Sequence, residues 1–157
     1  MSDSLFPTFP SDAALEPEIS FHVEDVEQPM PDFTVLTLWI ERVIQYHKGV
    51  LGQLQYIFCS DVYLHQLNVE YLDHDTLTDI ITFPYADPPV VSGDLYISTD
   101  RVAENATELG LPFLTELQRV IIHGVLHLCG FGDKTEEEAQ QMRELEEEAL
   151  VMLANMV

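Results

Sequence analysis

The chain has 157 residues, 46 % of them hydrophobic, and a formal net charge of −22 at pH 7. This length suits a single domain with a sizeable core, and the hydrophobic fraction excludes a disordered chain. No apolar run approaches the length of a membrane-spanning helix, about 18 residues, and the first residues lack the basic segment of a signal peptide. We therefore expect a cytoplasmic protein.

The negative charge bears on the kind of partner. Six Lys and Arg residues face 28 Asp and Glu residues, the opposite of the basic surface that nucleic-acid-binding proteins present to phosphates. This charge argues against an RNA substrate unless salt screens the repulsion, since the Debye length falls to about 3 Å at 1 M. We hypothesise a host with a salty cytoplasm, and equal stability at low salt and in molar potassium chloride would contradict it. The alternative is that the acids merely solvate the C-terminal helix.

The N-terminal third of the chain predicts an arm, a strand, a helix and a second strand. Residues 1–18 contain prolines among Ser and Asp without any periodicity, which indicates a mobile arm. Apolar residues alternate over 19–23 and over 53–59, as in half-buried strands. Between these strands, apolar residues recur at helical spacing over 32–47, and Gly49 is expected to close that helix.

The middle of the chain predicts a helix and two strands. Ser60 is placed to cap a helix whose apolar stripe is Leu64, Leu67 and Tyr71. Residues 72–77 then form a polar connection, in which His74 is expected to be a solvated loop residue rather than a substrate contact. Strands are predicted over 79–84, where a proline ends the run, and over 93–98.

Four reactive side chains in these segments have structural interpretations. Asp79 and Asp94 stand at strand starts, where turn or backbone-binding roles are favoured over catalysis. Cys59 and Cys129 are the two cysteines and indicate buried thiols rather than a disulfide framework. Cys129 is disfavoured as a metal ligand because a helix points it away from its neighbour two residues earlier.

The C-terminal third predicts three helices. Thr99 or Asp100 caps the first, over 99–108, and capping-box patterns at Thr115 and Thr135 begin the other two. The last helix has an apolar stripe that indicates a core face, made of Ala139, Met142, Leu145, Ala149, Met152 and Met156. The whole order of elements predicts an α+β fold, one domain over 19–157 with a small mixed four-stranded sheet covered by helices.

A pair of histidines followed by a carboxylate carries the chemistry. His123 and His127 are four residues apart in an apolar run, so a helix places both imidazoles on one face. Gly130 stands where this helix should stop, and Asp133 follows three residues later, close enough to turn back toward the histidines. The pattern H-x3-H-x5-D predicts a metal site on a helix and its turn, with His123, His127 and Asp133 as ligands.

Zinc is the first expectation for this site, with one ion. Imidazole and carboxylate suit zinc, and three protein ligands leave a fourth position for water, which is typical of catalytic rather than structural sites. Two histidines and one carboxylate also suit iron, manganese or nickel, so the metal identity stays open. Zinc peptidases place a glutamate after the first histidine as general base, and this chain has Gly124 there, which disfavours peptide hydrolysis.

The residues around the site resemble a known family. His123-Gly124, Leu126-His127-Leu128 and Gly130-Phe131 are similar to the H-G-x-L-H-L-x-G-[YF] signature of the YbeY family, bacterial metal-dependent endoribonucleases of ribosomal RNA maturation. The resemblance covers about residues 19–150 and continues upstream in three segments: Leu67-Asn68 with Tyr71, Thr78 to Pro84, and Gly93 to Ser98. Two positions depart from the pattern. Asp133 replaces the usual third histidine, and Leu72 replaces an arginine that the resemblance associates with the RNA phosphate.

The resemblance implies a metal-dependent, single-strand-specific endoribonuclease that acts on ribosomal RNA during ribosome maturation, with the ribosome or its small subunit as partner and no role for DNA. From the residues alone only a metal-activated hydrolase follows, in which water at His123, His127 and Asp133 is the reactive group and no side chain is named as general base. Two rivals stay open. One is a ribosome-assembly binding protein with a structural metal, and the other is a metallopeptidase-like hydrolase.

Overall fold

The computed structural model describes residues 16–30, 32–72 and 78–157. Four strands form one sheet in the order β1-β2-β4-β3, in which β1, β2 and β4 are parallel and β3 is antiparallel to β4. This confirms the predicted α+β fold with a mixed four-stranded sheet. The elements are, in chain order, β1 (Glu18–Val23), α1 (Thr34–Tyr46), β2 (Val50–Cys59), α2 (Asp61–Leu72), β3 (Ile80–Pro84), β4 (Val90–Ser98), α3 (Thr99–Leu109), α4 (Phe113–Leu128) and α5 (Glu136–Ala154).

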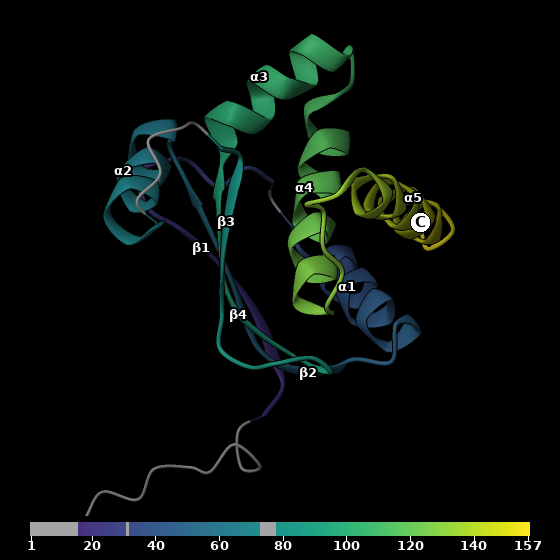
Figure 1. Cartoon of the computed structure of the whole chain (residues 1–157). Helices are drawn as coiled ribbons and strands as arrows, with labels where there is room; N and C mark the ends of the chain where they lie inside the picture. Colours follow the sequence, from purple (N-terminus) through teal and green to yellow (C-terminus); the bar gives the residue numbers. More distant parts are fainter. Residues whose placement is uncertain (1–15, 31, 73–77) are drawn as a thin grey trace, which may run out of the picture.

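Helices cover both faces of the sheet (Figure 1). On one face, α1, α4 and α5 enclose the main core, in which Trp39, Tyr56 and Leu95 are fully buried. On the other face, α2 packs over a smaller cluster around Leu64 and Ile81. Adjacent residues of a strand point to opposite faces, so β3 and β4 contribute to both layers.

One glycine sets how closely α4 lies against the sheet. A Cβ atom added to Gly124 would come 2.3 Å from Leu95 Cδ2 and 2.8 Å from Ile80 Cδ1, which is closer than carbon atoms can approach. The Tyr56 hydroxyl, from the central strand β2, donates a hydrogen bond to the carbonyl of Ile121 at 3.1 Å. The histidine-bearing helix is therefore seated directly on β3 and β4.

Two helices begin at residues other than those predicted. The capping box at Thr115 is wrong, because α4 begins at Phe113 with Pro112 as its N-cap. Pro112 has the extended backbone of an N-cap, and Phe113 packs against the main core, so packing outweighs the side-chain cap. Helix α3 is capped by the Ser98 hydroxyl, which accepts from the Arg101 N–H at 3.0 Å, rather than by Thr99 or Asp100.

Of two other predicted helix ends, one is wrong and one is confirmed. The prediction that Gly49 closes α1 is wrong, because the left-handed conformation after this helix is taken by Lys48, with φ +63°. The Gly49 N–H then donates a hydrogen bond to the Ile44 carbonyl at 2.8 Å. The capping box of α5 is confirmed, since the Thr135 hydroxyl accepts from the Glu138 N–H and the Glu138 side chain accepts from the N–H of Thr135. Of the two capping boxes predicted from the sequence, only the one at Thr135 is therefore present.

Several predictions concern the chain ends and loops. Strand β1 begins at Glu18, the last residue of the predicted arm, and 1–15 and His74 lie outside the described residues. The division into an arm and one domain over 19–157 stays a prediction. Across the described ranges, we find no helix with both the length and the apolar character needed to cross a membrane.

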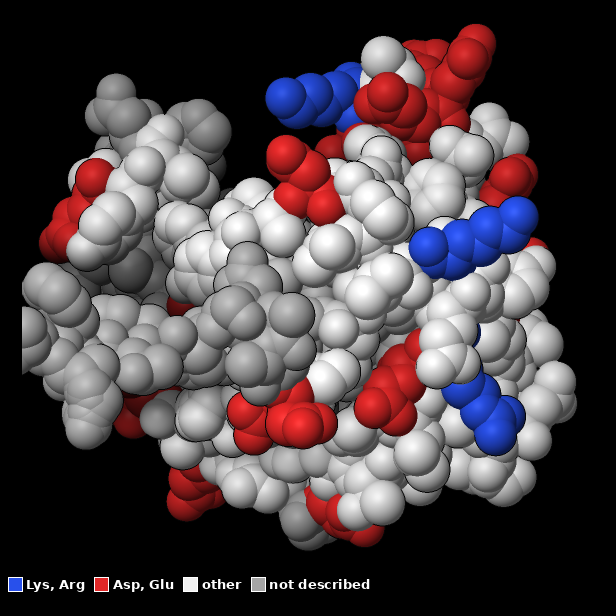
Figure 2. Space-filling model, turned by 90° about the horizontal axis from the view of Figure 1, so that it is seen from below, with Lys and Arg blue, Asp and Glu red and all other residues white. Residues whose placement is uncertain are grey.

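Charge is unevenly displayed on the surface. Figure 2 views the molecule from the end at which α4 finishes, and acidic side chains are spread around this face while basic ones lie toward its top and right. Arg101 and Arg119 are engaged in ion pairs with acids.

Candidate metal centre

A single helix and the turn after it bring the three predicted ligands together. His123 and His127 lie one turn apart on α4, which ends at Leu128. Gly130 then takes φ +108°, a conformation that residues with a Cβ rarely adopt. A Cβ there would also come 3.3 Å from Pro88 Cγ. This glycine reverses the chain and returns Asp133 to the histidines.

The three ligand atoms form a compact triangle. His127 Nε2 lies 3.0 Å from His123 Nε2 and 3.2 Å from Asp133 Oδ2, and His123 Nε2 lies 3.4 Å from the same oxygen. Metal–ligand bonds of about 2.0–2.1 Å give ligand–ligand separations of about 3.0 Å in an octahedron and about 3.3 Å in a tetrahedron. The triangle therefore has the size that one divalent ion requires.

The other ring nitrogen of each histidine fixes which atom is free to bind. His123 Nδ1 lies 2.6 Å from a Glu146 carboxylate oxygen, and His127 Nδ1 lies 2.9 Å from the Phe131 carbonyl oxygen. Both partners are acceptors, so each Nδ1 carries a proton and each neutral ring presents the lone pair of Nε2 to the centre. Two lone pairs and a carboxylate oxygen that converge in this way repel one another, and a bound cation removes this repulsion.

A buried charge network supports His123 from behind. The Glu146 side chain, on α5, is 3 % exposed and accepts from Arg119 at 3.1 Å as well as from His123. Arg119 also forms a two-point ion pair with Glu116, whose side chain is fully buried. Burial favours such a pairing because an unpaired charge in the interior is costly.

The sequence reasoning missed Glu116 and Glu146. Glu146 stands among the other acids of α5 and Glu116 in the first turn of α4, so the sequence pattern singled out neither. A usable signal was nevertheless present for Glu146, which stands four residues after Met142 and three before Ala149, on the stripe predicted to face the core. An acid on an apolar helix stripe indicates a buried partner.

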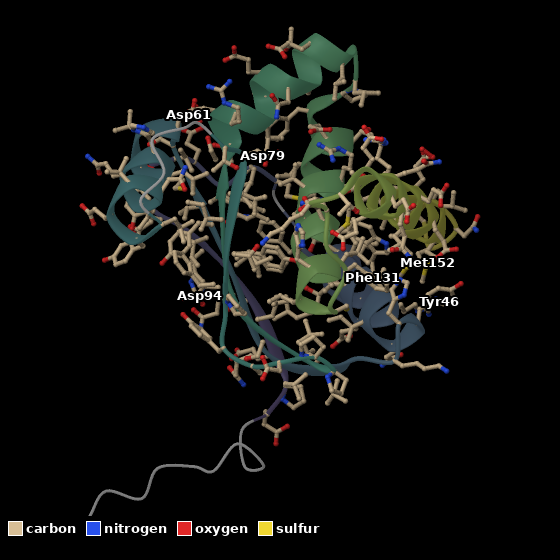
Figure 3. The ribbon with its side chains drawn as sticks, in the orientation of Figure 1. Tyr46, Asp61, Asp79, Asp94, Phe131 and Met152 are labelled. Atoms are coloured by element: carbon tan, nitrogen blue, oxygen red, sulfur yellow. The ribbon has the colours of Figure 1, made fainter. Side chains whose placement is uncertain are left out.

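The three candidate ligands open into a cleft of about 430 Å³, which we call the metal cleft. Leu72, Asp79 and Thr82 contribute to its walls with the three ligands. Burial raises the pKa of Asp79, and the nearby charges of Arg119 and His123 oppose that rise. The Asp79 carbonyl accepts from the Ser98 N–H at 3.0 Å, so this residue has the predicted backbone role and also places its carboxyl group in the metal cleft. Figure 3 labels Asp79 at the upper end of β3.

Two other predicted residues lie apart from this centre. The Asp94 carboxylate accepts a hydrogen bond from the Tyr85 hydroxyl and does not line the metal cleft. Cys129 is not a member of the three-residue ligand group, and burial raises the pKa of its thiol to about 11. Both cysteines are free thiols. His74 lies outside the described residues.

The chain is similar to known proteins over most of its length. Residues 19–154 match the family model described as endoribonuclease YbeY. The chain belongs to the YbeY family. A member from Amoebophilus asiaticus is 47 % identical over 140 residues, which cover 88 % of this chain and 94 % of the relative. A member from Christiangramia forsetii is 51 % identical over 114 residues, which cover 73 % of this chain and 80 % of the relative.

A solved structure also resembles the fold. The solution structure of TM1509 from Thermotoga maritima superposes with a TM-score of 0.63 and is 27 % identical in sequence. The matched region covers 88 % of this chain and 93 % of the TM1509 chain. The family prediction made from the H-G-x-L-H-L-x-G-F stretch is confirmed. In this YbeY-family chain the third position of the ligand triangle is an aspartate, and Leu72 stands in the metal cleft at the position where the sequence resemblance led us to expect an arginine.

Proposed function

We propose that this protein is a metal-dependent endoribonuclease that cleaves single-stranded RNA, with ribosomal RNA as its substrate and the ribosome as the place where it acts in the cytoplasm. The relatives named endoribonuclease YbeY support the reaction. The triangle of His123 Nε2, His127 Nε2 and Asp133 Oδ2 is the single observation that carries the metal dependence. Three protein ligands of this type favour zinc.

The residues of the site have separable roles in this proposal. A bound divalent ion would polarise a phosphoryl oxygen and lower the pKa of a water molecule toward 7. Glu146 and the Phe131 carbonyl hold the two imidazoles in the tautomer that can bind it. Asp79, whose carboxyl group also lines the metal cleft, is available to exchange a proton with water there.

The test is cleavage of ribosomal RNA by the zinc-loaded protein, compared with His123→Ala, at salt concentrations from low to molar. We expect cleavage by the wild type and a loss of at least about 100-fold in the variant, because a ligand is removed. His22→Ala, on the exposed surface of β1, is the matched histidine control and should cleave normally. A salt optimum near 1 M would support the salty-cytoplasm hypothesis.

The opposite result would favour one of the two alternative functions. Intact RNA at every salt concentration, from a folded protein with one zinc per chain by elemental analysis, would contradict the nuclease and favour the ribosome-assembly binder. Cleavage of casein that disappears in His123→Ala would favour the metallopeptidase-like hydrolase instead.

A further inference from the structure

The edge strand of the sheet forms one wall of the metal cleft. Among the described strands, β3 pairs with β4 alone, and Ile80, Ile81 and Thr82 line the cleft beside the three candidate ligands. Thr82 and His127 also line an adjoining hollow of about 680 Å³, so both residues stand where the two hollows meet. A substrate strand that crosses the candidate ligands therefore passes the backbone of β3 at Thr82.

The backbone groups of β3 point alternately to β4 and to the open edge. The Tyr85 N–H donates to a β4 carbonyl, and the Asp79 carbonyl accepts from a β4 N–H, both at 3.0 Å. In an antiparallel pair, the residues between such bonded positions direct their N–H and C=O groups away from the partner strand. From the register, these outward residues are Ile80, Thr82 and Pro84.

Of the described residues at this edge, Thr82 is the one with both backbone groups free. Pro84 has no N–H, and the Ile80 carbonyl accepts from the Thr78 hydroxyl at 3.3 Å. Within the described ranges, no residue accepts from the Thr82 N–H or donates to the Thr82 carbonyl. An extended peptide needs a row of such groups to add a strand, so one donor and one acceptor favour a smaller recognition unit.

The charge of the metal cleft makes uncharged donors important. Its described lining includes Asp79 and Asp133 but neither Lys nor Arg. Attraction by protein cations supplies most non-specific nucleic-acid binding, so a nucleic acid here needs other contacts besides the ion. Backbone N–H groups are regular donors to phosphate oxygens, and the ribose 2′-hydroxyl can donate to a carbonyl.

We propose that the backbone of Thr82 binds one ribonucleotide of the RNA strand, next to the candidate metal ligands. Its N–H donates to a phosphate oxygen, and its C=O accepts from the 2′-hydroxyl of the same nucleotide. A phosphate oxygen only accepts and the 2′-hydroxyl can donate, so the two free groups of Thr82 match the two groups of the nucleotide. The inference rests on the proposed function and deepens it, since the choice of RNA over DNA becomes a property of this edge.

The experiment scans single-stranded oligoribonucleotides in which one 2′-hydroxyl at a time is replaced by hydrogen or by fluorine, neither of which can donate. Binding to the zinc-loaded protein is measured by fluorescence anisotropy before cleavage is detectable, and cleavage is measured separately. The proteins are the wild type, Thr82→Pro and Thr82→Val. Thr82→Pro removes the N–H at an outward position, where this edge already contains Pro84. Thr82→Val is the matched control, because it removes only the side-chain hydroxyl.

In the wild type we expect one position at which loss of the 2′-hydroxyl weakens binding by about 5-fold, the size of one hydrogen bond between uncharged groups. Thr82→Pro should bind the intact strand at least about 10-fold more weakly, because a hydrogen bond to a charged phosphate is lost. Its remaining sensitivity at that position should be below about twofold, since the nucleotide is no longer held at the carbonyl. Thr82→Val should bind and discriminate as the wild type does.

Zinc content per chain reports whether Thr82→Pro is folded, because Thr82 is not one of the three candidate ligands. Where this variant lacks zinc, replacement of the Thr82 amide by an ester removes the same N–H without the proline ring. The same losses of affinity and of 2′-hydroxyl sensitivity are expected from the ester.

The outcomes separate this inference from the nuclease activity. Cleavage with no sensitive 2′-hydroxyl, or a folded Thr82→Pro that binds as tightly as the wild type, would overturn the ribonucleotide site and leave the nuclease intact. Binding that depends on one 2′-hydroxyl and on the Thr82 N–H, without any cleavage, would support the site and overturn the nuclease. Absence of binding to any strand would overturn both.

The other partner that an open edge can take is an extended peptide. Binding of the peptide Lys-Val-Lys-Val-Lys that is lost in Thr82→Pro, with RNA binding unchanged in that variant, would overturn the ribonucleotide site and assign this edge to a protein partner.

Discussion

The two histidines and the aspartate of the ligand triangle are held in different ways. Each histidine stands on α4 and has its second ring nitrogen bonded to Glu146 or to the Phe131 carbonyl. Asp133 stands in the turn, its side chain is 40 % exposed, and within the described residues its carboxylate has no hydrogen-bonded neighbour other than the histidine pair. The histidine half is half-buried and held by partners that pack into the folded core, and the carboxylate half lies at the surface.

Because of this difference, we expect fold stability and metal affinity to depend on different parts of the triangle. Of the partners of the histidine half, Glu146 is buried and Phe131 is half-buried against the main core, so a change there disturbs both packing and ligation. The carboxylate half contributes little burial, so a change there should affect ligation alone. Three substitutions test this contrast through their effects on the free energy of unfolding without metal.

The largest effect is expected for Glu146→Ala. Removing this buried carboxylate leaves His123 Nδ1 without its acceptor and Arg119 with Glu116 alone. Loss of one partner from a buried charge network costs about 3–5 kcal/mol. Urea unfolding of the metal-free protein measures it. Glu147→Ala, at the exposed neighbouring position, should change stability by less than about 0.5 kcal/mol, and equal effects would remove the contrast.

A smaller loss is expected for Gly124→Ala. The added methyl group would overlap Leu95 and Ile80, and such overpacking costs about 1–3 kcal/mol. Alanine also gains about 1 kcal/mol of helix propensity over glycine, so we expect a net loss of about 0–2 kcal/mol. Thermal unfolding gives the change. A stabilised variant would show that α4 can shift away from the sheet at no cost.

The smallest effect on the metal-free fold is expected for Asp133→Ala, less than about 0.5 kcal/mol, because this side chain is exposed. Its effect should be seen in zinc binding instead. Zinc at 100 times its dissociation constant should stabilise the wild type by about 2.7 kcal/mol, and the same concentration should stabilise the variant far less. Equal stabilisation by zinc would exclude Asp133 as a ligand.

Local patterns were enough to predict the parts of the site that one helix and one turn determine. The four-residue spacing of His123 and His127 needs only helix geometry, and Gly130 needs only the rarity of its backbone conformation in other residues. The capping box of Thr135 and Glu138 is equally local. The structure brings the predicted ligands together, and metal binding by them stays a prediction.

What the sequence did not reveal depends on contacts between distant segments. Glu146 supports His123 from another helix, and its sequence neighbours are acids that hide it. The start of α4 at Phe113 follows from core packing, which a capping pattern cannot report.

The residues of the metal cleft come from separate segments of the chain, which bears on how the protein can evolve. His123, His127, Asp133 and Glu146 fall within 24 consecutive residues of α4, its turn and α5, whereas Leu72 and Thr82, which line the metal cleft beside them, belong to α2 and β3. Under the proposed function, the segment that holds the ion and the segments that line the rest of the cleft are encoded apart. Descendants of this chain can therefore change the lining of the metal cleft by mutation in α2 or β3 and inherit the histidine-bearing helix unaltered.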